Sequence, residues 1–341
     1  MKTSWSILSL ENARLVRDGF FVWTMVFTLT GCSAINVKLG RRVDLSKTPV
    51  TSIEVSLPKG PGIAPGHTSP LVVTATQPDG KVLLSEGQGK GKIQWKELKV
   101  TATVVTVNQK GVISLAKDPR VSDGRVGHVS VTVPSQPGVM STELDVPFVY
   151  NVAFVSSFSG KAGSDGSNGS DGTDGSSGSS GSMDPNNPSP GGNGGDGTNG
   201  SDGEDGGPGG NAPPVQVLMT LQPGSMPLIQ FSVSASGHRR LYLVDPQGGT
   251  LTVHADGGPG GRGGRGGRGG QGGQGGIGMP DGQDGHSGLD GTNGQDGPPG
   301  KGGLITVTYD PMAQAYVTLL HLTGTNGPSP VFQVQAVAPL W

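Results

Sequence analysis

The first half of the chain alternates apolar and polar residues between turn signals. From about Asn36 to Phe158 no helical period of useful length is present. Short runs rich in β-branched residues predict strands, bounded by proline, glycine, asparagine or aspartate. The predicted strands span 51–57, 71–76, 92–95, 100–107, 111–115, 128–133 and 146–155. Strands at this short, regular spacing predict a β-sandwich over 51–158.

The same alternation returns in two separate pieces of the C-terminal half. The first piece contains the predicted strands 215–221, 227–234, 239–244 and 250–254. The second piece contains 303–309, 313–322 and 331–338. Either piece alone is small for a stable sheet domain, whereas together they would make a seven-stranded sandwich. We therefore expect 215–256 and 304–341 to share one small β-sandwich, and the fold class to be mainly β.

Four stretches of the chain place glycine at every third residue. They are tract 1 (160–181), tract 2 (191–209), tract 3 (257–278) and tract 4 (282–303), with eight, seven, eight and eight in-register glycines. This period is typical of the polyproline II helix and its polyglycine II form, in which three residues per turn leave one edge bare for a neighbouring helix. Tract 3 has two all-glycine columns, so we expect it to contact neighbours on two sides and to be the most buried.

An intramolecular bundle, a trimeric collagen rod and disordered linkers are all compatible with this period. Collagen depends on imino acids, which are scarce inside these triplets. Paired tracts of equal length, about 68 Å for 22 residues at 3.1 Å per residue, suit out-and-back hairpins. Hairpins also return the chain to one sandwich. We therefore expect two glycine-rich hairpins, over 160–211 and 257–303, and a monomer in preference to a trimer. A lone tract has no internal hydrogen bonds and would be disordered.

The remaining columns of the tracts are polar. Tract 3 carries an arginine column, and the other three tracts carry acidic or amide columns. The arginines are Arg262, Arg265 and Arg268, and the aspartates are Asp165, Asp171, Asp174, Asp196, Asp202, Asp205, Asp284, Asp290 and Asp296. We expect the arginines to pair with the aspartates, and we regard the aspartate columns as candidate weak cation sites. Neither EF-hand nor calcium-repeat spacing is present, so no dedicated metal site is predicted.

Composition and charge exclude several classes of function. Only 32% of the 341 residues are hydrophobic, so the chain cannot form one large apolar core. The net charge of −2 gives no general attraction to nucleic acid, and the arginine string lacks interleaved aromatic residues. No apolar run reaches eighteen residues, so no transmembrane helix is expected. The six histidines are scattered and no nucleophile elbow occurs, so we predict no catalytic residues, no cofactor and no enzymatic activity.

An apolar stretch over 20–30 leads to the single cysteine of the chain, Cys32. The sequence Leu29-Thr30-Gly31-Cys32 resembles the lipobox of bacterial lipoproteins, whose cysteine thiol receives a diacylglyceryl group. This resemblance implies a signal peptide at 1–31, a linker at 32–50 and a palmitate-bearing lipid anchor on Cys32. Ser33 resembles the pattern that is sorted to the outer membrane of Gram-negative bacteria. The long n-region leaves the true start codon open.

Two further resemblances concern the exported part of the chain. The runs 71–80, 93–95, 111–113 and 127–133 resemble the bacterial Ig-like domains of surface proteins, which implies an Ig-like sandwich over 51–158. The tract-bearing layout resembles collagen-like, glycine-repeat lipoproteins of environmental bacteria. These resemblances imply a non-enzymatic structural or adhesion protein of the cell envelope, with extracellular matrix or a surface glycan as partner. The alternatives are a surface module that binds a glycan, a cation or ice through its polar columns and, third, an envelope hydrolase.

Overall fold

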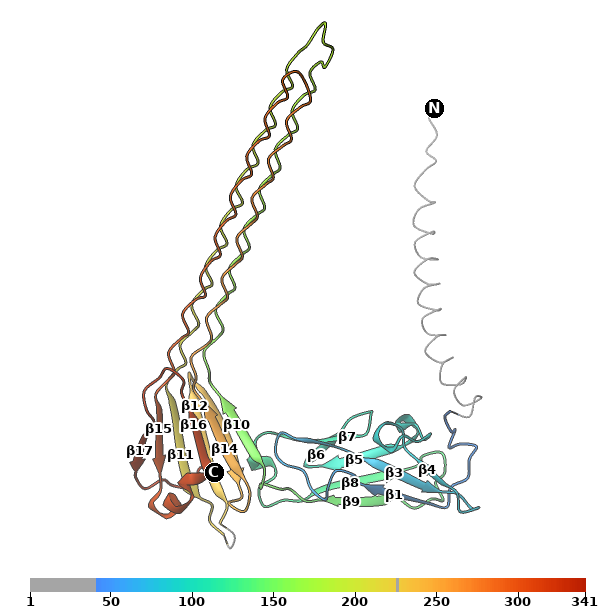
Figure 1. Cartoon of the computed structure of the whole chain (residues 1–341). Coiled ribbons are helices and arrows are strands. Elements are labelled where there is room, and N and C mark those ends of the chain that lie inside the picture. The colour runs from blue at the N-terminus through green and yellow to red at the C-terminus, as the bar shows by residue number, and fades with distance from the viewer. Residues whose placement is uncertain (1–40, 225–226) are drawn as a thin grey trace, which may run out of the picture. The chain divides into compact units, whose positions relative to one another are not determined.

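The computed structural model describes residues 41–341 except 225–226 (Figure 1). The predicted signal peptide at 1–31, the lipobox residues Leu29, Thr30 and Gly31, and the lipid-acceptor Cys32 lie outside the described residues. The described residues up to 150 form one compact unit, and residues 151–341 form a second. We call them unit 1 and unit 2. The chain is mainly β, as predicted from its alternating pattern.

Unit 1 is a β-sandwich of three-stranded antiparallel sheets. The strands are β1 (Ser52–Ser56), β2 (Thr68–Pro70), β3 (Val72–Thr76), β4 (Val82–Leu84), β5 (Lys99–Thr103), β6 (Val105–Val107), β7 (Val112–Leu115), β8 (Gly127–Thr132) and β9 (Thr142–Val146). Their inward residues, among them Ile53, Val73 and Ile113, are buried in one apolar core with Trp95. Gly111 is required beside that ring, because its φ is +69° and an added Cβ would overlap the indole of Trp95.

Three predictions for unit 1 were wrong in detail. The segment 92–95 is not a strand: Ile93 forms isolated bridges, and Trp95–Glu97 is a short 3-10 helix, η2. The predicted strand 100–107 is divided into β5 and β6 at Val104, whose φ of 66° interrupts an extended backbone. Residues 41–50 are not a linker, since Leu45 is fully buried in the core and its N–H donates to Glu97 Oε2 at 2.7 Å.

Unit 2 contains a second sandwich, made of a five-stranded and a three-stranded sheet. The first has the order β13-β12-β11-β15-β17, and the second has the order β10-β14-β16. Their bounds are β10 (Ala153–Ser157), β11 (Val215–Leu221), β12 (Ile229–Ala235), β13 (His238–Val244), β14 (Thr250–His254), β15 (Ile305–Tyr309), β16 (Leu320–Thr323) and β17 (Val331–Val334). Met219, Phe231, Leu251 and Ile305 are almost fully buried between the sheets. The shared sandwich of the two C-terminal pieces is therefore confirmed, and the predicted strands 215–221 and 250–254 match to the residue.

This sandwich has eight strands where seven were predicted. The predicted strand 146–155 is split: Val146 ends β9 in unit 1, and β10 pairs in parallel with β14 in unit 2. The first domain therefore ends near Tyr150 and not at 158. The predicted strand 313–322 is also wrong, because Pro311–Leu319 forms a 3-10 helix, η4, and only Leu320–Thr323 is a strand. Asp310 caps η4 by accepting the N–H of Met312 at 2.9 Å.

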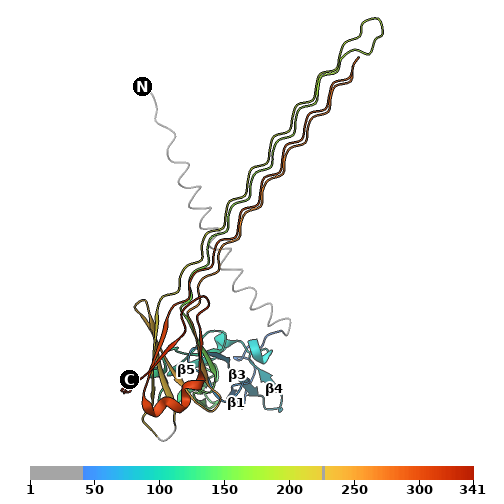
Figure 2. The ribbon, with the colours of Figure 1, turned by 60° about the vertical axis from the view of Figure 1, so that its left-hand side comes forward.

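The four glycine tracts leave this sandwich together as one elongated bundle (Figures 1 and 2). Residues 182–190 connect tracts 1 and 2 at the far end, where Figure 1 shows a green loop, and residues 279–281 connect tracts 3 and 4. Each pair is an antiparallel hairpin, as predicted, and the two hairpins bond to each other along their length. The tracts belong to unit 2.

Candidate functional site

Backbone hydrogen bonds with a period of three residues hold the bundle together. Tract 1 bonds to tract 3 in parallel, for example through Gly163 N–H to the Pro259 carbonyl at 2.8 Å. Tract 2 bonds to tract 4 in parallel and to tracts 1 and 3 in antiparallel, and tract 4 bonds to tract 3. Tracts 2 and 3 therefore each contact three neighbours, while tracts 1 and 4 contact two. This arrangement supplies the lateral bonds that a lone polyproline II helix lacks.

Many of these bonds form chains across the whole bundle. Gly285 N–H donates to the Gly273 carbonyl at 2.8 Å, and Gly273 N–H donates to the Gly195 carbonyl at 2.9 Å. Gly195 N–H in turn donates to the Ser176 carbonyl at 2.8 Å, so one chain links tracts 4, 3, 2 and 1. Gly273 and Gly195 thus use both their N–H group and their carbonyl in bonds to other tracts, so their backbone polar groups are paired inside the bundle.

Glycine is required in the tracts because the backbones lie close together. Every glycine with positive φ among the described residues lies outside the tracts, so conformational freedom is not the reason. A Cβ on Gly163 would overlap the Gly207 carbonyl, and one on Gly264 would overlap the Ser167 carbonyl. Tract 3 is bare on two columns, and its Gly258–Gly276 column is buried throughout. The prediction that tract 3 is the most buried is confirmed.

The aspartate and asparagine columns cap the backbone of the neighbouring tract. In tract 1, Asp165, Asp171 and Asp174 accept the N–H groups of Arg262, Arg268 and Gln271 at 2.7–2.8 Å. In the same way, the tract 2 column accepts backbone N–H groups of tract 4, and the tract 4 column accepts backbone N–H groups of tract 3. These further aspartate acceptors are Asp196, Asp202, Asp205, Asp284, Asp290 and Asp296, with Asn168, Asn193, Asn199 and Asn293 in the same role. The columns thus occupy N–H groups that the carbonyls leave unpaired.

Two interruptions of the columns coincide with prolines in the facing tract. The acceptors of tract 1 lie 97 residues before their donors in tract 3, and by the same offset Ala162 faces Pro259. The acceptors of tract 2 lie 90 residues before their donors in tract 4, and by that offset Pro208 faces Pro298. Since proline has no N–H group, the acceptor is missing where no donor exists. The register between the two hairpins therefore accounts for both interruptions.

The arginine column does not pair with the aspartates as predicted. Arg262, Arg265 and Arg268 are exposed, and no ion pair joins their guanidinium groups to an acid within the described part of the chain. The aspartate oxygens contact the backbone N–H groups of these arginines instead, because the short aspartate side chain reaches the adjoining backbone directly. The guanidinium groups thus point to the outside of the bundle.

The aspartate columns do not converge on a common point. Neighbouring side chains in one column are one turn apart, about 9 Å, since three residues rise 3.1 Å each. No group of three or more acidic, histidine or cysteine side chains that could hold a metal ion occurs in the described ranges 41–224 and 227–341. Hydrogen bonds from the His286 and Thr292 backbones hold the pKa values of Asp196 and Asp202 below the usual aspartate value. Weak cation binding by these columns stays a prediction.

A polar cluster lies where the sandwich meets the bundle. His254 Nδ1 lies 2.7 Å from Thr323 Oγ1 and 3.4 Å from Asp256 Oδ2. Asp256 also accepts the N–H and hydroxyl of Thr325, both at 2.8 Å. Burial raises the pKa of Asp256, but the hydrogen bonds from Thr325 and Thr323 outweigh it and leave that pKa lowered. This cluster connects β14, β16 and the start of tract 3, so its evident role is structural.

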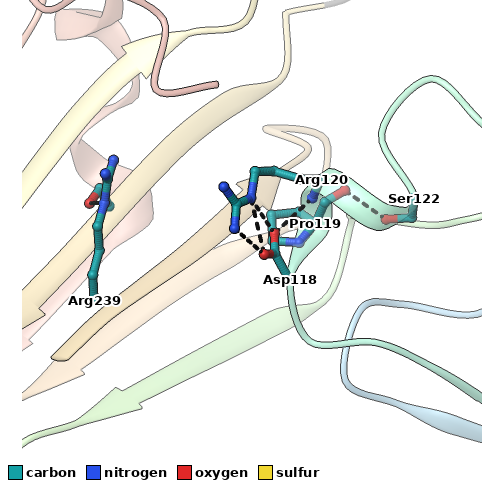
Figure 3. Close-up of polar contacts among 6 residues, drawn as sticks. Asp118, Pro119, Arg120, Ser122 and Arg239 are labelled. Carbon is teal, nitrogen blue, oxygen red and sulfur yellow. Dashed lines mark hydrogen bonds and ion pairs between the residues drawn. The ribbon is translucent and has the colours of Figure 1, made fainter.

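Two further polar contacts lie outside the bundle. In unit 1, Asp118 caps the 3-10 helix η3 (Pro119–Val121), and its carboxylate is bound by the Arg120 guanidinium at 2.6–3.0 Å (Figure 3). The side-chain bond from Arg120 lowers the pKa of Asp118. In unit 2, Arg239 Nε donates to Ser232 Oγ at 2.7 Å. A hollow of about 630 Å³ in unit 1 is lined by Lys99 and by uncharged residues of 132–141.

Comparison with known proteins gives no family for this chain. It matches no model of a protein family, and no curated protein matches it. The described residues contain no helix long and apolar enough to cross a membrane. The bundle and its attachment to the sandwich are therefore the features that bear on function.

Proposed function

We propose that this chain is a non-enzymatic, lipid-anchored structural or adhesion protein of the bacterial cell envelope, which displays its polyglycine II bundle at the cell surface. The observation that carries the proposal is the bundle itself. Four tracts of one chain form a long rod that is fixed at one end to a β-sandwich (Figure 2). The proposed anchor is the lipid on Cys32, within the outer membrane.

The attachment of the bundle to the sandwich supports a role in presenting a surface. The parallel pairing of β10 with β14 continues into tracts 1 and 3, through Phe158 N–H to the His254 carbonyl and Gly160 N–H to the Asp256 carbonyl, both at 2.8 Å. On the other side, tracts 2 and 4 continue into the parallel pair β11 and β15. All four tracts are thus extensions of sheet ladders, so continuous backbone hydrogen bonding joins the bundle to the sandwich.

The far end of the bundle is its most apolar part and the natural contact point. Met183, Ile277 and Met279 are 61%, 61% and 50% exposed, and Leu289 is the one other large apolar side chain that is exposed along the described residues 160–303. All three belong to the same end of the bundle, since Gly181 N–H bonds to the Ile277 carbonyl and Met279 N–H bonds to the Ser189 carbonyl in the connecting loop. Several exposed apolar side chains at one end of a rod favour that end as a contact surface.

The anchor and the adhesive end call for separate experiments. Radiolabelled palmitate should enter the wild-type chain in cells and be lost in Cys32→Ser; a mature protein that retains Met1 would contradict the anchor. Adhesion of expressing cells to matrix-coated surfaces should fall in the Met183→Ser, Met279→Ser variant. Leu289→Ser is the matched control, because Leu289 is 72% exposed on the side of tract 4. Equal adhesion of both variants would contradict the role of the tip.

A second candidate function is supported by the exposed arginine column. Arg262, Arg265 and Arg268 are spaced by one turn, about 9 Å, and their guanidinium groups carry no ion pair within the described residues. Such a row suits an acidic surface glycan, which repeats its charges along a chain. A glycan array should then show acidic glycans bound by the wild type and lost when the three arginines are replaced by glutamine. A calcium titration tests the cation alternative.

A further inference from the structure

The two edges of the five-stranded sheet in unit 2 are protected very differently. At one edge, β13 carries His238, Arg239 and Arg240, and charged side chains of this kind discourage pairing with another chain. At the other edge, β17 has the sequence Val-Phe-Gln-Val, and no charged residue occurs between 322 and 341. Every residue of β17 is exposed. An apolar, uncharged edge strand is an open site for strand addition.

The apolar side chains of β17 extend the buried face of the sheet. By the register with β15, Phe332 lies beside Val307 and Val334 lies beside Tyr309. Val307 is fully buried, so Phe332 and Val334 point to the same side as the core. They are nevertheless 49% and 57% exposed. The inner face of the five-stranded sheet therefore extends beyond the part that is covered.

The backbone of β17 has free hydrogen-bonding groups on the outer edge. Gln335 N–H donates to the Tyr309 carbonyl at 3.0 Å, so the backbone groups of Gln335 face β15. Because these groups alternate along a strand, those of Phe332 and Val334 face away from β15. The chain then leaves this edge: Val337 bonds to Thr220 and Leu340 bonds to Gln230, both over the middle strands.

We propose that β17 is the interface of a homodimer, in which two copies pair their β17 strands in antiparallel about Gln333. In this register Phe332 of each copy lies opposite Val334 of the other, and both pairs exchange N–H and carbonyl bonds. The same pairing places apolar side chains on the inner face of both copies, and Gln333 opposite Gln333 on the outer face. Side-chain parity and the outward-facing backbone groups restrict the centre of such a pair to Phe332, Gln333 or Val334. Only the centre at Gln333 pairs both outward-facing residues of β17 with residues of β17 in the other copy, and this arrangement has two-fold symmetry. The two bundles extend in opposite directions.

Cysteine cross-linking tests this register directly. Residues at a non-hydrogen-bonded antiparallel pair have Cα atoms about 4.5 Å apart, which a disulfide can span. Under mild oxidation the full-length Gln333→Cys chain, purified in detergent, should run mostly as a dimer without reductant. Gln335→Cys should not cross-link, because its two copies are four residues of strand apart, about 13 Å. Val331→Cys with Gln335→Cys in one chain should cross-link again.

The remaining outcomes distinguish the dimer from other states. The parent chain reports any background from Cys32, and His238→Cys on the protected β13 edge reports random collision. Val334→Lys should halve the mass measured by light scattering, because a charge on the inner face of an edge blocks pairing. Its far-ultraviolet circular dichroism should stay unchanged, since Val334 is mostly exposed. A monomeric parent chain, or equal cross-linking at 333, 335 and 238, would overturn the proposal.

Discussion

Neighbouring glycines in one tract have different reasons to be glycine. In tract 2, a Cβ on Gly194 would overlap the backbone carbonyl of Gly273. A Cβ on Gly195 would lie 3.1 Å from the hydroxyl and 3.2 Å from the backbone N of Ser176, which are close contacts that a small shift relieves. The chain itself uses this freedom, because Thr198, Ser201 and Glu204 occupy the same column as Gly195. In tract 2, only the column that contains Gly194 therefore has no room for a side chain.

This difference predicts opposite outcomes for two adjacent substitutions. Gly194→Ala should destabilise unit 2 by about 1–3 kcal/mol, the usual cost of forcing a methyl group into a filled space. Gly195→Ala should change the free energy of unfolding by less than about 0.5 kcal/mol, as for a surface site. Urea unfolding of both variants gives the comparison. Equal effects would mean that the tracts do not pack as described.

The capping aspartates predict a loss of bundle stability in acid. The backbone bonds from His286 and Thr292 lower the folded pKa values of Asp196 and Asp202. A lowered folded pKa contributes stability above the unfolded value, about 3.9, and that contribution disappears as pH falls through the folded pKa. The melting temperature of unit 2 should thus fall below about pH 4. Asp196→Asn with Asp202→Asn keeps the acceptor oxygens without the titration, so this variant should lose less; an identical acid dependence would contradict the role of the two carboxylates.

At the scale of elements, the alternating pattern predicts strands better than it predicts their partners. The strands Val215–Leu221 and Thr250–His254 were predicted correctly, because turn residues bound both runs. The strand Ala153–Ser157 was assigned to the wrong sandwich, since alternation carries no information about which sheet a strand joins. For η4, the signal was present but missed: Asp310 followed by Pro311 is a helix start, and the apolar run after it was interpreted as a strand.

The hairpins were predictable from tract lengths, and the two bare columns of tract 3 predicted a second neighbour for it, whereas the parallel pairing of tract 1 with tract 3 and of tract 2 with tract 4 was not predicted. Glycine periodicity identifies a bare edge but does not say which tract approaches it. The sequence feature that could have identified the partner tracts was the position of the column interruptions: Ala162 faces Pro259, and Pro208 faces Pro298. The arginine column was misinterpreted because opposite charges suggest ion pairs, whereas the nearest donors to the aspartates are backbone N–H groups.

The matched register of the tracts predicts that whole levels of the bundle can be removed. Residues 172–174, 197–199, 269–271 and 288–290 form one level, since their members bond to one another, as Thr198 N–H does to the Thr173 carbonyl. Deleting all four triplets should leave every remaining pair in register and shorten the bundle by about 9 Å. Deleting only 288–290 shifts one tract against two neighbours and should lower the melting temperature clearly. Small-angle scattering and thermal unfolding measure both effects, and equal stability of the two variants would contradict the register.

At the scale of the whole molecule, the chain consists of a unit without tracts and a unit that depends on them. Unit 1 has its own core around Ile93 and Trp95. In unit 2, β10 and β14 enter the tracts, and β11 and β15 leave them, so the sandwich is assembled from segments that the tracts bring together. The sandwich and the bundle should therefore unfold as one cooperative body, and unit 1 should unfold separately.

Calorimetry of a bundle variant tests this division. In Gly264→Val with Gly267→Val, the new side chains would overlap the carbonyls of Ser167 and Ser170, at the centre of the bundle. The melting temperature of unit 2 should fall by roughly 5–20 °C, because two overpacked sites cost about 1–3 kcal/mol each. The transition of unit 1 should not move. Arg265→Val with Arg268→Val is the control, since it adds the same side chains to the exposed column of the same tract. If both transitions shifted together, or if the control lost as much stability, the bundle would not be what joins the strands of unit 2.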